Sequence, residues 1–153
     1  MTLTKIRMAF PATAVCVAAA LGLGACSSGE GSNEKSDVQK FLNVLDAAVR
    51  TGNTDLRVAH LNQAVIDRYG EQQCRDFLAG QQDPTRRDRV KSVGKPESFE
   101  YATDDQSVVV AQALPVQVHE TSKGRKGDRN IHLVRINDQF SYFIDCGGPL
   151  VRQ

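Results

Sequence analysis

The chain has 153 residues, with 19 basic and 18 acidic side chains and a formal net charge of +1. A near-neutral chain has no general electrostatic attraction for nucleic acid, so no nucleic-acid partner is expected. The length suffices for one globular domain with a proper hydrophobic core.

The first 25 residues have the layout of a secretory signal, because Lys5 and Arg7 precede an apolar run from residue 8 to residue 23. That run is shorter than the roughly 20 residues that a membrane-spanning helix needs. Segment 23–26 (LGAC) resembles the lipobox of bacterial lipoproteins, in which the signal is removed before the cysteine. The resemblance implies a diacylglycerol group on the thiol of Cys26. A plain signal peptide and an uncleaved anchor are the alternatives.

Residues 26–35 are expected to form a lipidated, flexible tether, because they bury too little apolar surface to offset the entropy of ordering. Two or more acyl chains hold a protein on a bilayer, since each buried methylene contributes about 0.8 kcal/mol. We therefore expect an exported protein on the outer face of the bacterial cytoplasmic membrane, with the outer membrane as the alternative. Removal of residues 1–25 takes away two basic residues and no acid, which leaves 17 basic and 18 acidic side chains.

Two of the four cysteines are available for a disulfide bond in the mature chain. Cys16 lies in the predicted signal and Cys26 is committed to lipid, which leaves Cys74 and Cys146 as an even pair in an oxidising setting. Cys74 lies on the apolar face of a helical segment, and Cys146 on the more apolar face of an alternating one. A redox-active pair would typically be close in sequence, and two cysteines without nearby histidines make a poor metal site. We therefore predict a structural Cys74–Cys146 disulfide.

Helical periodicity begins at Ser36, where Gln39 completes a capping-box pattern. The first predicted helix ends before Gly52. Its apolar stripe comprises Val38, Phe41, Leu42, Leu45, Ala48 and Val49. A second helix is predicted from the capping residues 53–55 to Tyr69, and a third over residues 71–79.

Beyond Arg89 the apolar residues alternate with a period of two, which indicates strands. Pro115 cannot donate to a strand ladder, so it implies an edge, a bulge or a bend in the strongest strand. Asn137-Asp138 predicts a tight hairpin between the last two strands. The strands are predicted over residues 97–103, 107–120, 130–136 and 139–146.

About three helices followed by an antiparallel sheet of about four strands predict one α+β domain over residues 36–153. This order resembles the NTF2-like (cystatin-like α+β) superfamily, in which a strongly curved sheet wraps around a long first helix to form a cone. Segments 51–55 (TGNTD), 67–70 (DRYG) and 140–143 (FSYF) carry the resemblance. A cystatin-type single-helix sheet and another helix-capped antiparallel sheet are the alternatives.

The resemblance brings enzymes into consideration, because NTF2-like folds host isomerases and cyclases that use an acid and a hydrogen-bond donor in the cone. His60, Asp67 and Tyr69 are the clustered candidates, and a seven-residue spacing would put His60 and Asp67 on one helix face. No second element supplies an obvious base or oxyanion donor. We therefore expect His60 and Asp67 to be solvated and Tyr69 to pack at the helix end.

Gln112 is a polar residue in an otherwise apolar strand face. Together with Tyr69 it is a candidate pocket residue, since ligand pockets are apolar with a few placed polar groups. The alternative is a Gln112 side chain that pairs with the backbone at a bulge caused by Pro115, and we favour it because most buried polar groups are satisfied internally.

The remaining polar residues predict no cofactor or metal site. His119 and His132 lie in different strands without a zinc-binding spacing. The basic loop 123–129 lacks the ending of a phosphate-binding loop, so we expect a mobile, solvated hairpin tip. The same solvated role is expected for Arg86, Arg87 and Arg89.

The sequence therefore predicts a membrane-anchored envelope lipoprotein whose domain binds a partner protein or a small apolar ligand without catalysis. A small enzyme of the isomerase or cyclase type is the alternative. A structural homodimer formed through the outer sheet face is a third possibility.

Overall fold

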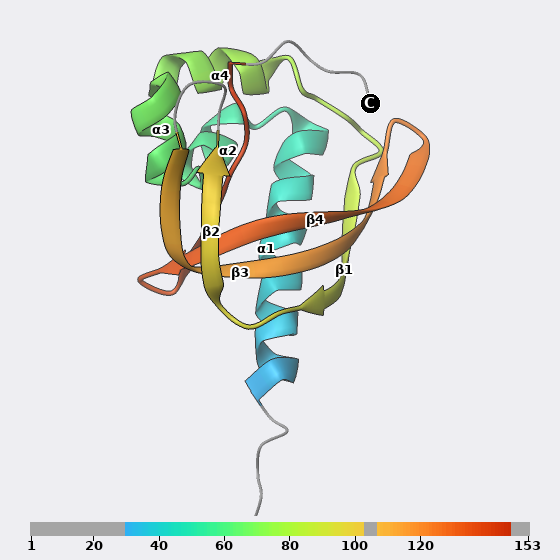
Figure 1. Cartoon of the computed structure of the whole chain (residues 1–153). Helices are drawn as coiled ribbons and strands as arrows, with labels where there is room; N and C mark the ends of the chain where they lie inside the picture. Colours follow the sequence, from blue (N-terminus) through green and yellow to red (C-terminus); the bar gives the residue numbers. More distant parts are fainter. Residues whose placement is uncertain (1–29, 103–106, 148–153) are drawn as a thin grey trace, which may run out of the picture.

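The computed structural model describes residues 30–102 and 107–147, so Cys26 and the predicted signal lie outside the described residues. The domain is α+β, with helices first and an antiparallel sheet second, as predicted (Figure 1). The described residues form four helices and five strands, rather than about three and about four. These are α1 (Glu30–Thr51), α2 (Thr54–Ala59), α3 (Gln63–Tyr69), α4 (Glu71–Ala79), β1 (Arg87–Val93), β2 (Glu97–Ala102), β3 (Ser107–Ser122), β4 (Arg125–Ile136) and β5 (Gln139–Tyr142).

Helix α1 begins at Glu30 rather than at Ser36, so the prediction of a flexible tether is wrong for residues 30–35. Acidic residues near a helix N-terminus interact favourably with its macrodipole, and Glu34 is such a residue. The Lys35 ammonium also donates to the carbonyl of Lys91 at 2.8 Å, which fixes this part of the helix against the sheet.

The predicted second helix is two helices, α2 and α3, because the chain between them pairs with β5. Leu61 forms a parallel bridge with Tyr142. The amide of Tyr142 donates to the carbonyl of His60, and the amide of Asn62 donates to the carbonyl of Tyr142. The Asn62 side chain then accepts from the amide of Ala64 and caps α3. The apolar residues of α2 and α3 keep a helical spacing, but the chain between the two helices pairs with β5 like a strand.

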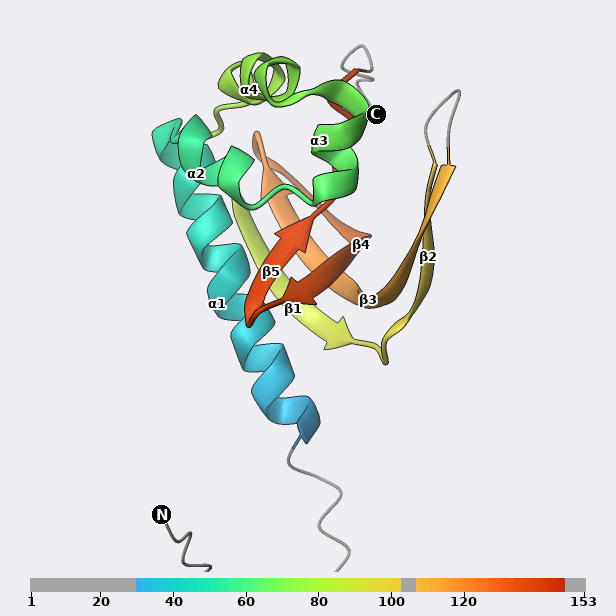
Figure 2. The same ribbon diagram turned by 90° about the vertical axis from the view of Figure 1, so that its left-hand side faces the viewer.

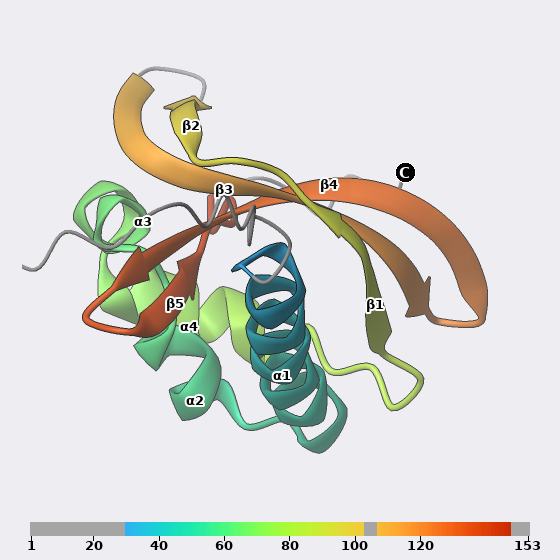
Figure 3. The same ribbon diagram turned by 90° about the horizontal axis from the view of Figure 1, so that it is seen from below.

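Strand β3 is the central strand of the sheet. Its first half pairs with β2, and its second half pairs with β1 on one edge and β4 on the other, while β5 extends the sheet beyond β4. Figure 3 shows the strands β3 and β4 arching over α1, and Figure 2 shows α2, α3 and α4 gathered at one end of the domain. The sheet is therefore strongly curved, and α1 lies on its concave side.

The strand boundaries differ from the predicted ones in three places. Strand β1 was not predicted. Strand β4 begins at Arg125, so the basic segment 125–129 belongs to a strand rather than to a hairpin tip, and the turn is at Lys123-Gly124. Strand β5 ends at Tyr142, before the predicted end at Cys146. The hairpin at Asn137-Asp138 is confirmed, and both residues have the positive φ that a two-residue turn of this kind requires.

A polar stripe on α1 covers the outer edge of β1. The Gln39 amide donates to the carbonyl of Asp88 and accepts from the amide of Val90, so it bonds the sheet rather than capping a helix. The Asp46 carboxylate accepts from the amide of Asp88, and the Arg50 guanidinium donates to the carbonyl of Arg86. An uncovered edge strand would expose unpaired backbone groups, and these side chains satisfy them.

Two apolar clusters hold the layers together. The first lies between α1 and the sheet, and the second joins the short helices, β2 and the segment after β5. Cys74 and Cys146 are buried in the second cluster and form a disulfide bond. The buried residues of both clusters lie between Val38 and Cys146, so a fragment of residues 27–153 contains all the residues of these two clusters.

Removal of the disulfide is expected to destabilise the domain by about 4 kcal/mol, because the bond closes a loop across a sequence separation of 72 residues. Urea unfolding of the oxidised and the reduced fragment measures the difference. The double variant Cys74→Ala/Cys146→Ala is the control, since its stability should not respond to reductant. Coincident unfolding curves for the oxidised and reduced proteins would contradict the prediction.

Candidate functional site

A cavity of about 580 Å³ lies between the helices and the concave face of the sheet. This volume is in the range of small-molecule sites. Its apolar lining comprises Leu42, Leu45, Val49, Phe77, Leu78, Ile131, Leu133, Tyr142, Phe143 and Ile144. Charged residues of the lining gather toward the β3–β4 turn and the start of β1: Asp46, Asp83, Arg86, Asp88, Glu120, Lys123, Arg125 and Arg129. The site therefore combines an apolar body with a charged rim.

The rim is held by a network of two guanidinium groups and three carboxylates. Arg86 lies 2.9 Å from Asp88, 2.8 Å from Glu120 and 3.5 Å from Asp46. Arg129 contacts the same Asp88 carboxylate at 2.8 Å and also pairs with Glu120. The expectation of a solvated Arg86 is therefore wrong, whereas Arg87 and Arg89 are exposed as predicted.

Two buried polar atoms of this network have no hydrogen-bond partner among the described residues. Asp46 and Asp88 are only 4% and 6% exposed. Burial raises the pKa of Asp46, although the hydrogen bond from the Asp88 amide acts in the opposite direction. The Nε atom of Arg86 and the Oδ1 atom of Asp88 are buried without a hydrogen-bond partner. Unpaired buried polar atoms are costly, so this part of the cavity has spare capacity for hydrogen bonding.

Arg57 is a buried cation in the cavity lining. It is 7% exposed, and its Nη1 atom donates to the carbonyl of Leu78 at the end of α4 at 2.8 Å. Burial lowers the pKa of the Arg57 guanidinium, while the nearby Tyr142 hydroxyl raises it. No carboxylate of the described residues pairs with the Arg57 guanidinium, in contrast to Arg86.

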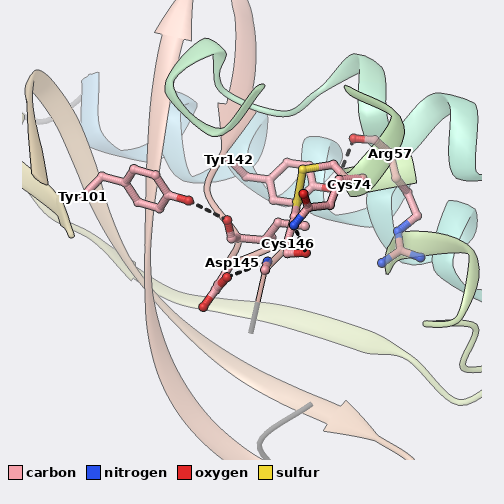
Figure 4. The surroundings of a disulfide bond; sticks show 9 residues. Arg57, Cys74, Tyr101, Tyr142, Asp145 and Cys146 are labelled. Carbon is pink, nitrogen blue, oxygen red and sulfur yellow. Dashed lines mark hydrogen bonds between the residues drawn. A yellow bond between two sulfur atoms is a disulfide. The ribbon is translucent and has the colours of Figure 1, made fainter. Parts of the chain in front are cut away.

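Tyr142 joins this cation to the sheet. Its hydroxyl donates to the carbonyl of Arg57 at 3.1 Å, and burial raises the pKa of Tyr142 to about 12. In Figure 4 the Tyr142 ring and the disulfide lie between Tyr101 on one side and the Arg57 guanidinium on the other. The Tyr101 hydroxyl donates instead to the carbonyl of Ile144, at 2.8 Å. The two tyrosines thus fix the segment after β5 from both sides.

Asp83 closes the rim between α4 and β1. Its carboxylate accepts four hydrogen bonds, from the amide and hydroxyl of Thr85, the hydroxyl of Ser122 and the amide of Lys123. Burial acts to raise the pKa of Asp83, but these bonds outweigh it and lower the pKa to about 2. The carboxylate therefore ties the β3–β4 turn to the loop before β1.

The two predicted pocket residues lie outside the cavity lining. Gln112 is exposed with a φ of 59°, at a bulge where the pairing of β2 with β3 shifts register. The expected bulge is present, although it precedes Pro115, but Gln112 is exposed rather than a buried side chain satisfied by the backbone. Tyr69 packs against Gly147. The pKa of the Tyr69 hydroxyl is raised, mainly by burial and secondly by a hydrogen bond with Asp145.

The structure does not bring the candidate catalytic residues together. The Nδ1 atom of His60 lies 3.2 Å from the carbonyl of Phe140, and its ring packs edge-on against Phe41. Asp67 is exposed and accepts from Gln63, and the helix break removes the common face that the spacing predicted. Among the described residues no group of three or more histidine, cysteine, aspartate or glutamate side chains could hold a metal ion.

The other two histidines have structural partners. His119 lies 2.8 Å from Asp128, and His132 stacks on Phe99 with 3.9 Å between ring centroids. His132 also lies 3.3 Å from Glu97 across the sheet. His119 therefore lies on the exposed surface of the sheet, whereas His132 is more buried and belongs to the cavity lining.

Sequence reasoning missed Asp46, Arg57 and Tyr142. A signal existed for Asp46, because it is four residues after Leu42 and three before Val49, directly beside the apolar stripe of α1. No comparable signal existed for Arg57, whose burial depends on the break between α2 and α3 and on the approach of β5.

Comparison of the chain with protein-family models, with curated protein sequences and with solved structures finds no match. Among the described helices, none is both long enough and apolar enough to cross a membrane.

Replacement of Asp83 by asparagine is expected to destabilise the domain by about 1–3 kcal/mol near neutral pH, because an amide nitrogen would face two donors. A carboxylate whose folded-state pKa is lowered contributes stability above its unfolded pKa and loses it as pH falls. The difference from the unchanged protein should therefore shrink as the pH falls from about 4 to about 2.

Urea unfolding at several pH values measures this effect. Asp76→Asn is the matched control, since Asp76 is exposed on α4 and accepts only from Gln72 among the described residues. A pH-independent difference between the Asp83 variant and the unchanged protein would refute the assignment.

Proposed function

We propose that this chain is an exported, lipid-anchored binding protein of the bacterial cell envelope, whose cavity takes a small, largely apolar molecule. The observation that carries the proposal is the cavity of about 580 Å³ with its apolar walls from α1, α4 and the segment after β5. Natural small-molecule sites are concave and combine apolar walls with placed polar groups, and this cavity has more polar residues in its lining than such sites usually have.

We infer that the domain is a variant of the NTF2-like cone. Supporting features are the long α1 on the concave side of the sheet, the short helices at one end, and the curvature of β3 and β4 (Figure 3). The cavity between the helices and the sheet would then be the interior of the cone. The inference concerns architecture, because a fold alone does not determine function.

The proposed anchor and the cavity rim lie at opposite ends of α1. Figures 1 and 2 both show the β3–β4 turn beside the C-terminal end of α1, far from Glu30. The 22 residues of α1 span about 33 Å. Cys26 is four residues before Glu30, so the connection reaches at most about 14 Å. Under this proposal the rim faces away from the membrane and exchanges ligand with the aqueous phase.

Lipid attachment at Cys26 predicts that an alkyne fatty acid supplied to bacteria expressing the full chain labels the protein and that Cys26→Ser abolishes the label. The acyl chains hold the protein in the membrane fraction, because their buried methylenes favour the bilayer. Cys16→Ser is the matched control and should keep the label. A label that persists on the Cys26 variant would show that the anchor is misplaced.

Native mass spectrometry of the oxidised fragment 27–153 is expected to show an extra mass that denaturation removes. The variant Leu45→Trp should lose the extra mass, because Leu45 lines the cavity and a larger side chain fills it. Val44→Trp is the matched control, since the neighbouring Val44 is 44% exposed and lies outside the lining. A bare monomer would point to a protein partner instead, and a bare dimer to a structural role of the sheet.

A further inference from the structure

We infer that the cavity ligand is a small carboxylic acid with an apolar body and that Arg57 binds its carboxylate. This inference rests on the proposed function and adds the chemical class of the ligand. Its basis is the difference between two guanidinium groups of the cavity: the half-buried Arg86 has three carboxylate neighbours, and the buried Arg57 has none among the described residues.

An arginine that is more than nine-tenths buried needs compensation for the water that it loses. The carbonyl of Leu78 takes one of the five N–H donors of Arg57, and the Tyr142 hydroxyl adds a neutral partner. Neither partner carries a full negative charge. A guanidinium fork matches a carboxylate with two parallel hydrogen bonds, so a carboxylate is the ligand group that fits the remaining donors.

Arg57 has a like charge among its neighbours. The charge of Arg86 repels the Arg57 guanidinium and contributes to lowering its pKa. The carboxylates that could offset this repulsion are already bonded to Arg86 and Arg129. A bound carboxylate would relieve both the desolvation of Arg57 and its repulsion from Arg86.

The walls around Arg57 favour an apolar body on that anion. Leu45, Phe77 and Tyr142 belong to the cavity lining and come from α1, α4 and the end of β5. These side chains pack against the two apolar clusters and also line the cavity, so the methylenes of a ligand would gain free energy by burial against them. The site therefore combines one unpaired cation with an apolar chamber, which describes the complement of an aliphatic or aromatic acid.

Isothermal titration of the oxidised fragment 27–153 with decanoate, decanol and decylammonium near neutral pH tests the inference. The three probes share one chain and differ in head-group charge. Decanoate should bind roughly 10- to 100-fold more tightly than decanol, because hydrogen bonds to a buried charged group contribute more than neutral ones. Decylammonium should bind most weakly, since its charge would repel Arg57.

The variants assign this preference to one residue. Arg57→Met should reduce the affinity for decanoate to that for decanol, and Arg57→Lys should retain part of the preference because the charge remains. Arg75→Met is the matched control, since Arg75 pairs with Asp55 and Glu71 outside the cavity lining, and it should bind like the unchanged protein. If Arg57→Met does not fold, as judged by its thermal unfolding, the lysine variant and the three probes on the unchanged protein carry the test.

The outcomes separate this inference from the proposed function. Equal binding of decanoate and decanol, or tightest binding of decylammonium, would overturn the inference and leave an apolar cavity site in place. A preference for decanoate that survives in Arg57→Met would overturn the assignment to Arg57. Failure of all three probes to bind would overturn the proposed function together with the inference.

Discussion

The packing of α1 along the outer edge of β1 is the constraint on which the rest of the structure depends. A sheet edge presents amide and carbonyl groups that must be paired or solvated. Lys35, Gln39, Asp46 and Arg50 pair them, and they follow one another at intervals of four, seven and four residues, which keeps them on one side of the helix. The apolar stripe of the same helix packs against the sheet. Its two stripes therefore fix the position and the rotation of α1, and with them one wall of the cavity.

Tyr142 provides the second fixed point, at the other side of the cavity. Its backbone pairs with the chain between α2 and α3, its hydroxyl bonds the carbonyl of Arg57, and its ring packs against both apolar clusters. The position of Arg57 consequently depends on residues that are 85 positions away in the sequence. The burial of this cation is a product of the tertiary structure, since α2 alone would expose it to water.

Local signals predicted the parts of the fold that depend on local interactions. The third helix over residues 71–79 and the hairpin at Asn137-Asp138 follow from amphipathic spacing and turn chemistry. The break at His60–Asn62 could not be predicted in this way, because Val58, Leu61 and Val65 keep a helical spacing across it and the competing bonds come from β5.

Strand β1 and the charged part of the cavity could not be predicted, because their charged residues have the composition of a solvated segment. In the segment 86–90, Asp88 alternates in phase with Val90, but the surrounding arginines have the composition of a solvated loop. The burial of Asp88 becomes favourable only when Arg86 and Arg129 reach it from two different elements. A sequence pattern records which residue types recur, and it does not record which distant charge will neutralise them.

The disulfide has a consequence for how fast a cavity of this kind can fill and empty. Cys74 is on α4, which supplies one wall, and Cys146 follows the residues 142–144 that supply the facing wall. A covalent link between the two walls prevents α4 from swinging open as a lid. Under the proposed function, exchange through the salt-bridged rim would require the breaking of ion pairs around Arg86. Because salt screens such pairs, ionic strength would then affect the residence time of a guest.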